Sequence, residues 1–175
     1  GLLLGAIVAI IFGYSIAHSK KVELILSPIL TASQAIPMVA IAPLFVLWFG
    51  PGLFSKILVC AIIIFFPVLV NTIHGLKNIP PDLKLLFLTL HASKWDTIRQ
   101  LEIPASLPTF LNGLKIGATL SVTGAIVGEF IGADRGLGYL INVARGQYDT
   151  AFVFGIVIIL VVLALSLYRG VEYLE

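Results

Sequence analysis

Side chains that could do chemistry are few in this chain, and they lie inside long apolar runs. The ionisable residues of these runs are His74, Lys115 and Glu129, and the single thiol is Cys60. A charge at membrane depth is a functional candidate, because its burial is costly. Here no nucleophile lies beside a base, and no group of residues has the spacing of metal ligands. Lys115 can extend its ammonium towards the cytoplasm, and Cys60 is typical of a small buried apolar residue. The pattern argues against an enzyme and predicts no metal site.

The composition is that of a membrane protein. Of the 175 residues, 59% are hydrophobic and 11% are charged, and the mean hydropathy is +1.07. A helix of about 20 mostly apolar residues crosses a bilayer. We predict an all-α, polytopic membrane helical bundle that forms one domain over residues 1–175, and no basic cluster suggests nucleic-acid binding. Five transmembrane helices, a to e, are expected at Gly1–Ala17, Leu24–Ser55, Ile57–Leu76, Leu107–Phe130 and Thr150–Tyr168.

Basic residues indicate the orientation, because Lys and Arg near span ends favour the cytoplasm. If the segment Leu83–Pro108 is inside, eight basic residues lie inside and three outside. The a–b loop, the c–d loop and the C-terminus are therefore predicted to be cytoplasmic. The inside set is Lys20, Lys21, Lys77, Lys84, Lys94, Arg99, Lys115 and Arg169, and the outside set is Lys56, Arg135 and Arg145.

A charged, amphipathic hairpin is predicted between helices c and d, within residues 77–106. Its first helix is expected over Asp82–Leu90. Ser93 and Asp96 are typical of a capping box that opens a second helix, which Pro104 should stop. Such a hairpin has two possible uses, since it can lie on the membrane surface or fit a groove on a partner. On its second helix, an apolar side is expected from Trp95, Ile98 and Leu101.

Small residues mark one side of helix d, and they let helix backbones approach closely. The pattern predicts tight packing between helices. Some of these small residues could also border a solute pathway or the contact between two copies of the chain. Helix b has three interior prolines, which kink a helix, so it is either a wall of a moving pathway or one long tilted helix. The helix d residues are Gly113, Gly117, Ser121, Gly124 and Gly128, and those of helix b are Pro28, Pro37 and Pro43 with Thr31, Ser33 and Gln34 between them.

The d–e loop is polar and contains glycine. Gly136 and Gly138 suggest a turn followed by a short outward helix, and Glu129 can reach water there or pair with Arg135 or Arg145. The loop does not have the G-x-G-x-x-G pattern of a dinucleotide site, and G-x-x-x-x-G-K-[ST] is absent from the chain. No nucleotide cofactor is therefore expected on this chain.

Several motifs together carry a family resemblance over nearly the whole chain. Residues Leu83–Pro108 resemble the "EAA" loop, roughly E-A-A-x-x-x-G, of inner-membrane permeases of binding-protein-dependent ABC importers. Other motifs are similar to the nitrate/sulfonate/taurine branch. The matching stretches are Thr89-Leu90, Ala92-Ser93, Lys94-Trp95, Ile103–Pro108, Ile36-Pro37, Pro43-Leu44, Leu47–Gly50, Phe66–Thr72, Gly128–Phe130 and Gly136–Ile141.

The resemblance implies a permease dimer, two cytoplasmic ATPase subunits that bind ATP and Mg²⁺, and an extracytoplasmic solute-binding protein. It implies about six spans, so that one N-terminal helix is expected to precede Gly1. It also implies that the hairpin couples to the ATPase and that the solute is nitrate-, sulfonate-, taurine- or pyrimidine-like. The implied coupling residues are Leu85, Thr89, His91, Ala92, Ser93, Lys94, Trp95, Ile98, Arg99 and Pro104.

Two positions depart from the family pattern. Leu85 stands where the motif has Glu, and His91 stands where it has Gly. The departures put the strength of coupling in question. The motif's Gly would serve a sharp turn of positive φ between the two hairpin helices, so His91 is expected to occupy such a turn. The alternative is that its imidazole contacts the ATPase. The rival function is an ATP-independent channel, which would not need the hairpin.

Overall fold

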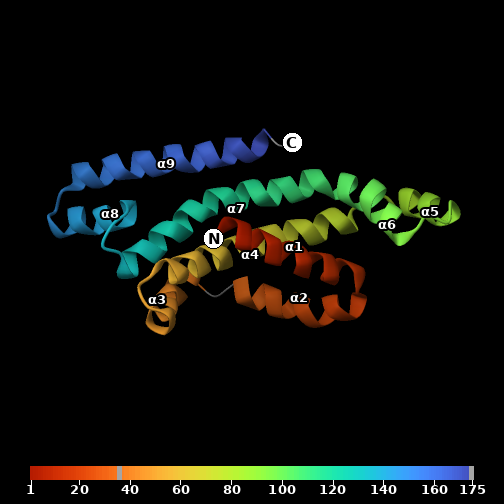
Figure 1. Ribbon diagram of the computed structural model, residues 1–175, viewed down its shortest axis with the longest axis horizontal. Helices are drawn as coiled ribbons and strands as arrows, with labels where there is room; N and C mark the ends of the chain where they lie inside the picture. Colours follow the sequence, from red (N-terminus) through yellow and green to blue (C-terminus); the bar gives the residue numbers. More distant parts are fainter. Residues whose placement is uncertain (35–36, 174–175) are drawn as a thin grey trace.

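The computed structural model describes residues 1–34 and 37–173, and all its regular elements there are helical (Figure 1). Helix α7 runs through the middle of the molecule, with α4 and α1 on one side and α9 on the other. The elements are α1 (Leu2–His18), α2 (Lys20–Gln34), α3 (Met38–Phe49), α4 (Leu53–Lys77), α5 (Pro81–Thr89), α6 (Lys94–Thr97), the π-helical η1 (Ile98–Glu102), α7 (Ile103–Gly132), α8 (Leu137–Gly146) and α9 (Thr150–Glu172).

Helix α4 is the centre of the packing, because α1 and α7 both lie directly against it. On α1, Gly5 lies so close to the carbonyl of Ala61 that a Cβ there would be 2.5 Å from its oxygen. Between these helices, Ile64, Val68 and Leu69 are fully buried. Small side chains therefore permit a close approach that buries the aliphatic residues of α4.

The small-residue side of α7 faces α4 along its length. A Cβ at Gly124 would lie 2.9 Å from the Cα of Cys60, and one at Gly117 would lie 2.9 Å from Cγ2 of Ile64. Ser121 is buried on the same side, where its carbonyl accepts a contact from the Cys60 thiol at 3.6 Å. Gly113 and Gly128 continue the contact, the former against Asn71 and Pro67 and the latter against Lys56.

Helix α9 lies along the other side of α7 and contacts α7 and α8 (Figure 1). Most of its surface is exposed in the single chain, and Ile156 is its buried residue. From Ala151 to Leu165 its exposed residues are apolar, as a surface in contact with lipid requires.

The predicted single helix b is wrong, because two helices occupy this stretch. Helix α2 follows α1 at a bend of 119°, and α3 is a separate helix that begins after Pro37. Pro28 and Pro43 lie inside α2 and α3, respectively. A proline has no N–H to donate, which explains why Pro37 precedes a helix rather than continuing one. Ile36 and the side chains of Thr31, Ser33 and Gln34 lie outside the described residues.

The all-α, polytopic membrane architecture is confirmed, but the count of five spans is not reproduced. Among the described residues, three helices are long and apolar enough to cross a bilayer: α4, the continuous helix Lys94–Gly132, and α9. The bent pair α1–α2 raises the number to four if it is one span. Helix α3 is too short, because only Ala40–Phe49 forms its apolar part.

We predict that Gly124→Leu destabilises the bundle by about 1–3 kcal/mol, because the added side chain meets the α4 backbone. Thermal unfolding in detergent should show a lower midpoint. Gly155→Leu on α9 is the matched control, since no atom lies within 4 Å of a Cβ at Gly155. Equal midpoints for the two variants would contradict the close packing of α7 on α4.

Candidate functional site

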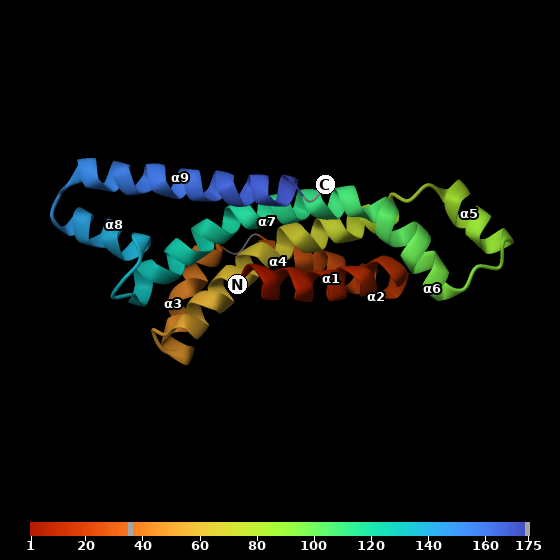
Figure 2. The ribbon, with the colours of Figure 1, turned by 45° about the horizontal axis from the view of Figure 1, so that its top comes forward.

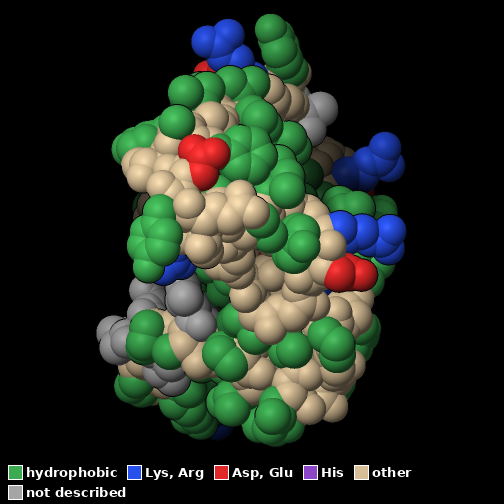
Figure 3. All heavy atoms as spheres, turned by 90° about the vertical axis from the view of Figure 1, so that its left-hand side faces the viewer, with side chains coloured by type: hydrophobic (Ala, Val, Ile, Leu, Met, Phe, Trp, Pro, Cys, Tyr) green, Lys and Arg blue, Asp and Glu red, His purple; other side chains and the backbone are tan. Residues whose placement is uncertain are grey.

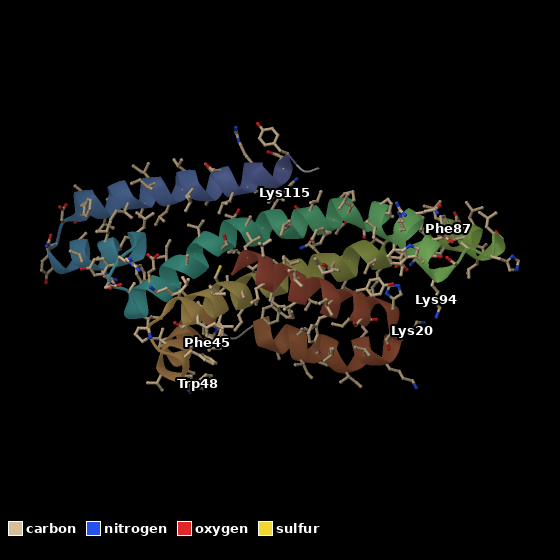
Figure 4. The ribbon with its side chains drawn as sticks, in the orientation of Figure 1. Lys20, Phe45, Trp48, Phe87, Lys94 and Lys115 are labelled. Atoms are coloured by element: carbon tan, nitrogen blue, oxygen red, sulfur yellow. The ribbon has the colours of Figure 1, made fainter. Side chains whose placement is uncertain are left out.

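The hairpin of α5 and α6 projects beyond the end of the helical bundle (Figure 2). Lys94 and Phe87 of the hairpin lie at the same end as Lys20, whereas Phe45 and Trp48 lie towards the opposite end (Figure 4). We call these two ends the hairpin end and the α8 end. The hairpin is therefore the part of the chain best placed to meet another molecule outside the bundle.

His91 makes the turn between the two hairpin helices. Its φ is 51°, the left-handed conformation predicted for this position. The N–H of His91 donates to the carbonyl of Leu88 (3.1 Å), and the N–H of Ala92 donates to that of Phe87 (3.1 Å). These bonds form a Schellman motif, in which the left-handed residue usually is Gly. The imidazole Nδ1 lies 3.1 Å from the carbonyl oxygen of Thr89, so His91 partly satisfies the end of α5.

Ser93 caps the second helix as the sequence predicts. Its hydroxyl accepts a bond from the N–H of Asp96 (3.1 Å) and donates to the Asp96 carboxylate (2.5 Å). Thr97 adds a hydroxyl bond to the carbonyl of Ser93 (3.0 Å). The start of the helix is therefore fixed by bonds among neighbouring residues.

The prediction that Pro104 ends this helix is wrong. The chain continues from Lys94 to Gly132 as one helix, and a π-helical turn, η1, ends at Glu102, two residues before the proline. Proline lacks an N–H and its ring collides with a carbonyl one α-turn earlier. The wider π turn precedes this ring, so the second helix of the hairpin runs directly into α7. A displacement at the hairpin would therefore act on α7 without an intervening loop.

The hairpin exposes large apolar side chains. Trp95 is 69% exposed, Leu85 is 61% exposed, and Leu88 and Leu90 are also exposed. The expected apolar side of Trp95, Ile98 and Leu101 is not one face, because Leu101 is buried against α4 while Trp95 points outwards. The π turn alters the angular spacing between these positions.

Polar contacts join the base of the hairpin to α1. The Glu102 carboxylate of η1 lies 2.8 Å from Nε2 of His18, whose ring packs on Tyr14 with centroids 4.2 Å apart. At the same end, Lys77 of α4 pairs with Glu23 of α2. The hairpin is thus attached to the bundle by side chains from distant parts of the sequence.

The remaining predicted coupling residues lie on the exposed surface of the hairpin. Thr89, Lys94, Arg99 and Pro104 are exposed, and Ala92 and Ile98 are half-buried. The structure therefore brings the predicted coupling residues together at one end of the molecule.

At the α8 end, Glu129 has a partner that the sequence analysis missed. Its carboxylate accepts a bond of 2.7 Å from the N–H of Gly138 in the first turn of α8. Neither Arg135 nor Arg145 forms an ion pair with Glu129 in the described residues. Gly136 has φ 121°, and a Cβ there would lie 2.3 Å from the Glu129 carboxyl group. The two glycines make room for a carboxylate that caps α8 from α7, as the helix dipole favours.

The described surface at the α8 end mixes charged and apolar side chains. Figure 3 views the molecule from this end, where acidic and basic side chains lie among apolar ones and some of them adjoin at the right-hand edge. A protein that docks here would meet a mixed surface of α3, the α7–α8 turn and α8.

Lys115 of α7 has an aromatic neighbour on α9. Lys115 is 7% exposed, and its ammonium lies 6.0 Å from the centre of the Tyr168 ring, near the C-terminal end of α9. That the ammonium extends towards the cytoplasm stays a prediction. The cation therefore lies in the contact between α7 and α9. Sequence alone does not show which neighbour covers a lysine in an apolar helix.

The sequence analysis also missed a polar face on α7. Asn112, Thr119 and Thr123 are exposed, as is Ile116 between them. Asn71 of α4 is half-buried in the contact between α4 and α7, against the position of Gly113. Spacings of four, three and four residues place the α7 residues on one side of a helix. That spacing could have revealed the face from the sequence.

Comparisons with known proteins identify the family of this chain. The family described as "Binding-protein-dependent transport system inner membrane component" matches residues 1–175. The riboflavin transport system permease protein RibX of Chloroflexus aurantiacus is 46% identical over 91% of this chain and 59% of its own length. The formylaminopyrimidine transport permease protein ThiX of Halalkalibacterium halodurans is 40% identical over 100% of this chain and 70% of its own length.

A third relative belongs to the branch that the sequence motifs resemble. The putative aliphatic sulfonates transport permease protein SsuC of Bacillus subtilis is 37% identical over 93% of this chain and 59% of its own length. The chain thus spans between about half and three quarters of the length of these relatives. This multi-pass membrane chain belongs to the family of inner-membrane components of binding-protein-dependent transport systems.

Proposed function

We propose that this chain is the permease subunit of an ABC-type importer, which forms the solute pathway and couples to a separate cytoplasmic ATPase through the hairpin. The observation that supports this proposal most directly is the projecting hairpin. It exposes Trp95 and Leu85 beyond the bundle, and its second helix continues into α7. Large apolar side chains in water favour burial against a partner. The continuous helix gives that partner a direct mechanical connection to a membrane span.

The proposed partners are ABC ATPase subunits, an extracytoplasmic solute-binding protein and a second permease copy. ATP and Mg²⁺ would bind to the ATPase, so this chain is a transport subunit without catalytic residues. The proposed location is the inner membrane with the hairpin in the cytoplasm. Basic residues at the hairpin end support this orientation, since Lys20, Lys77 and Lys94 lie there.

The proposed solute is small and either anionic or polar. The names of the relatives mention riboflavin, formylaminopyrimidine and aliphatic sulfonates. These solutes, together with the nitrate-, sulfonate-, taurine- and pyrimidine-like classes that the sequence motifs imply, are the ones to screen with the cognate binding protein.

Reconstitution tests the function as a whole. Proteoliposomes that contain the full-length permease, its ATPase and its binding protein should take up solute only when ATP is hydrolysed. An ATP-independent channel is the alternative, and solute flux without the ATPase would establish it instead.

The orientation predicts opposite labelling of the two ends. In a Cys60→Ser background, Lys94→Cys should react with an impermeant thiol reagent from the cytoplasmic side of the membrane. Arg135→Cys should react from the other side. Reaction of both cysteines from one side would exclude the proposed topology.

We expect Trp95→Ala to weaken ATPase binding about tenfold or more, because exposed aromatic residues often dominate interfaces. Affinity of the purified permease for the ATPase in detergent measures the effect. Trp48→Ala is the matched control, since Trp48 is 65% exposed but lies towards the α8 end (Figure 4). Unchanged affinity of Trp95→Ala would favour a hairpin that lies on the membrane surface.

His91→Gly should preserve coupling and raise stability by up to about 1 kcal/mol, because glycine adopts positive φ at low cost. Solute-stimulated ATP hydrolysis by the reconstituted complex should be equal to or above that of the natural protein. Tyr148→Gly is the control, since Tyr148 has φ 56° but lies outside the hairpin. A several-fold loss of stimulated hydrolysis in His91→Gly alone would show that the imidazole contacts the ATPase.

A further inference from the structure

The exposed side of α7 is polar at the depth where a lipid-facing surface should be apolar. Asn112, Thr119 and Thr123 lie in the middle of a helix of 30 residues, and all are exposed. The distance along the axis from Asn112 to Thr123 is about 16 Å, which is well within a hydrocarbon core of about 30 Å.

This polar face is separate from the surfaces that α7 uses for packing. Gly113, Gly117 and Gly124 face α4, and Lys115 faces Tyr168 of α9. At about 100° per residue, the polar face points between these two neighbours. The polar face is therefore left uncovered, although α4 and α9 pack against α7 on either side of it.

The side chains of this face differ in whether their hydrogen-bonding groups have partners within the protein. The Thr119 hydroxyl donates to the Lys115 carbonyl (3.1 Å), so this residue tolerates lipid. Within the described residues, the Asn112 amide makes no hydrogen bond. An unsatisfied amide in hydrocarbon is costly, so water or a polar solute is the favourable environment for this face.

The face is also uncharged. Lys115 is the one charged residue of α7 between its first residue, Ile103, and Glu129, and it is buried. The exposed polar groups are one amide and two hydroxyls, which both donate and accept hydrogen bonds. A charged solute would find no opposite charge along this wall.

We infer that the face of Asn112, Ile116, Thr119 and Thr123 lines the aqueous solute pathway, and that this wall suits an uncharged solute rich in hydrogen-bonding groups. The inference rests on the proposed transport function and narrows its solute class.

Cysteine reactivity in the assembled complex tests the position of the wall. Thr119→Cys, Thr123→Cys and Ile116→Cys, each with Cys60→Ser, are reconstituted with the ATPase and treated with a neutral hydrophilic methanethiosulfonate. Ile158→Cys and Val162→Cys are the controls, because these α9 residues are 64% and 58% exposed on an apolar surface. We expect the α7 cysteines to react at least tenfold faster than the α9 controls. Equal rates on the two helices would overturn the inference, because the face would then contact lipid or a sealed seam between copies.

Reagent charge tests the chemistry of the wall. Anionic and cationic methanethiosulfonates should modify the α7 cysteines at rates within a few-fold of each other. A tenfold preference for the anionic reagent would overturn the uncharged wall and favour an anion pathway.

ATP hydrolysis, measured on the same vesicles, separates this inference from the proposed function. Fast labelling of the α7 cysteines without coupled ATP hydrolysis would contradict the proposed importer function but support the aqueous wall. Normally coupled ATP hydrolysis with unreactive α7 cysteines would contradict the aqueous wall but support the proposed importer function. Three cysteine positions keep the test valid if one variant fails to fold.

Discussion

The close approach of α1 and α7 to α4 is the constraint on which the structure depends. In a bilayer, helices gain little from burying apolar surface, because lipid is itself apolar. Close packing between helix backbones holds the helices together instead. Gly5 on α1 and Gly124 on α7 lie where a Cβ would contact α4. The three helices form one packed unit, and the other elements are arranged around it.

The hairpin depends on this unit because its second helix is the start of α7. The π turn before Pro104 lets the helix pass the proline, and Glu102 of that turn contacts His18 at the end of α1. A partner seated on the hairpin would therefore push on α7 and α1 together. This geometry suits transmission of work into the membrane better than a flexible loop would.

The opposite end of α7 also connects to its neighbour through a side chain. Glu129 caps α8, and Gly136 and Gly138 leave room for its carboxylate. Motion of α7 would thus reach α8, which lies at the other end of the molecule from the hairpin (Figure 1). Between the two ends runs the polar face of Asn112 and Thr123, so one helix joins the candidate coupling surface, the candidate pathway and the α8 end.

The sequence by itself determined the helical membrane architecture, the cap at Ser93 and the turn at His91. These features follow from apolar runs and from hydrogen bonds among residues a few positions apart. Only the tertiary structure decided that α7 continues through Pro104, that Lys115 is buried beside Tyr168, and that Glu129 binds α8 rather than an arginine. It likewise decided which side of α7 stays uncovered. The physical reason is that these outcomes depend on contacts between helices distant in sequence, and local patterns do not specify which neighbour covers a given face.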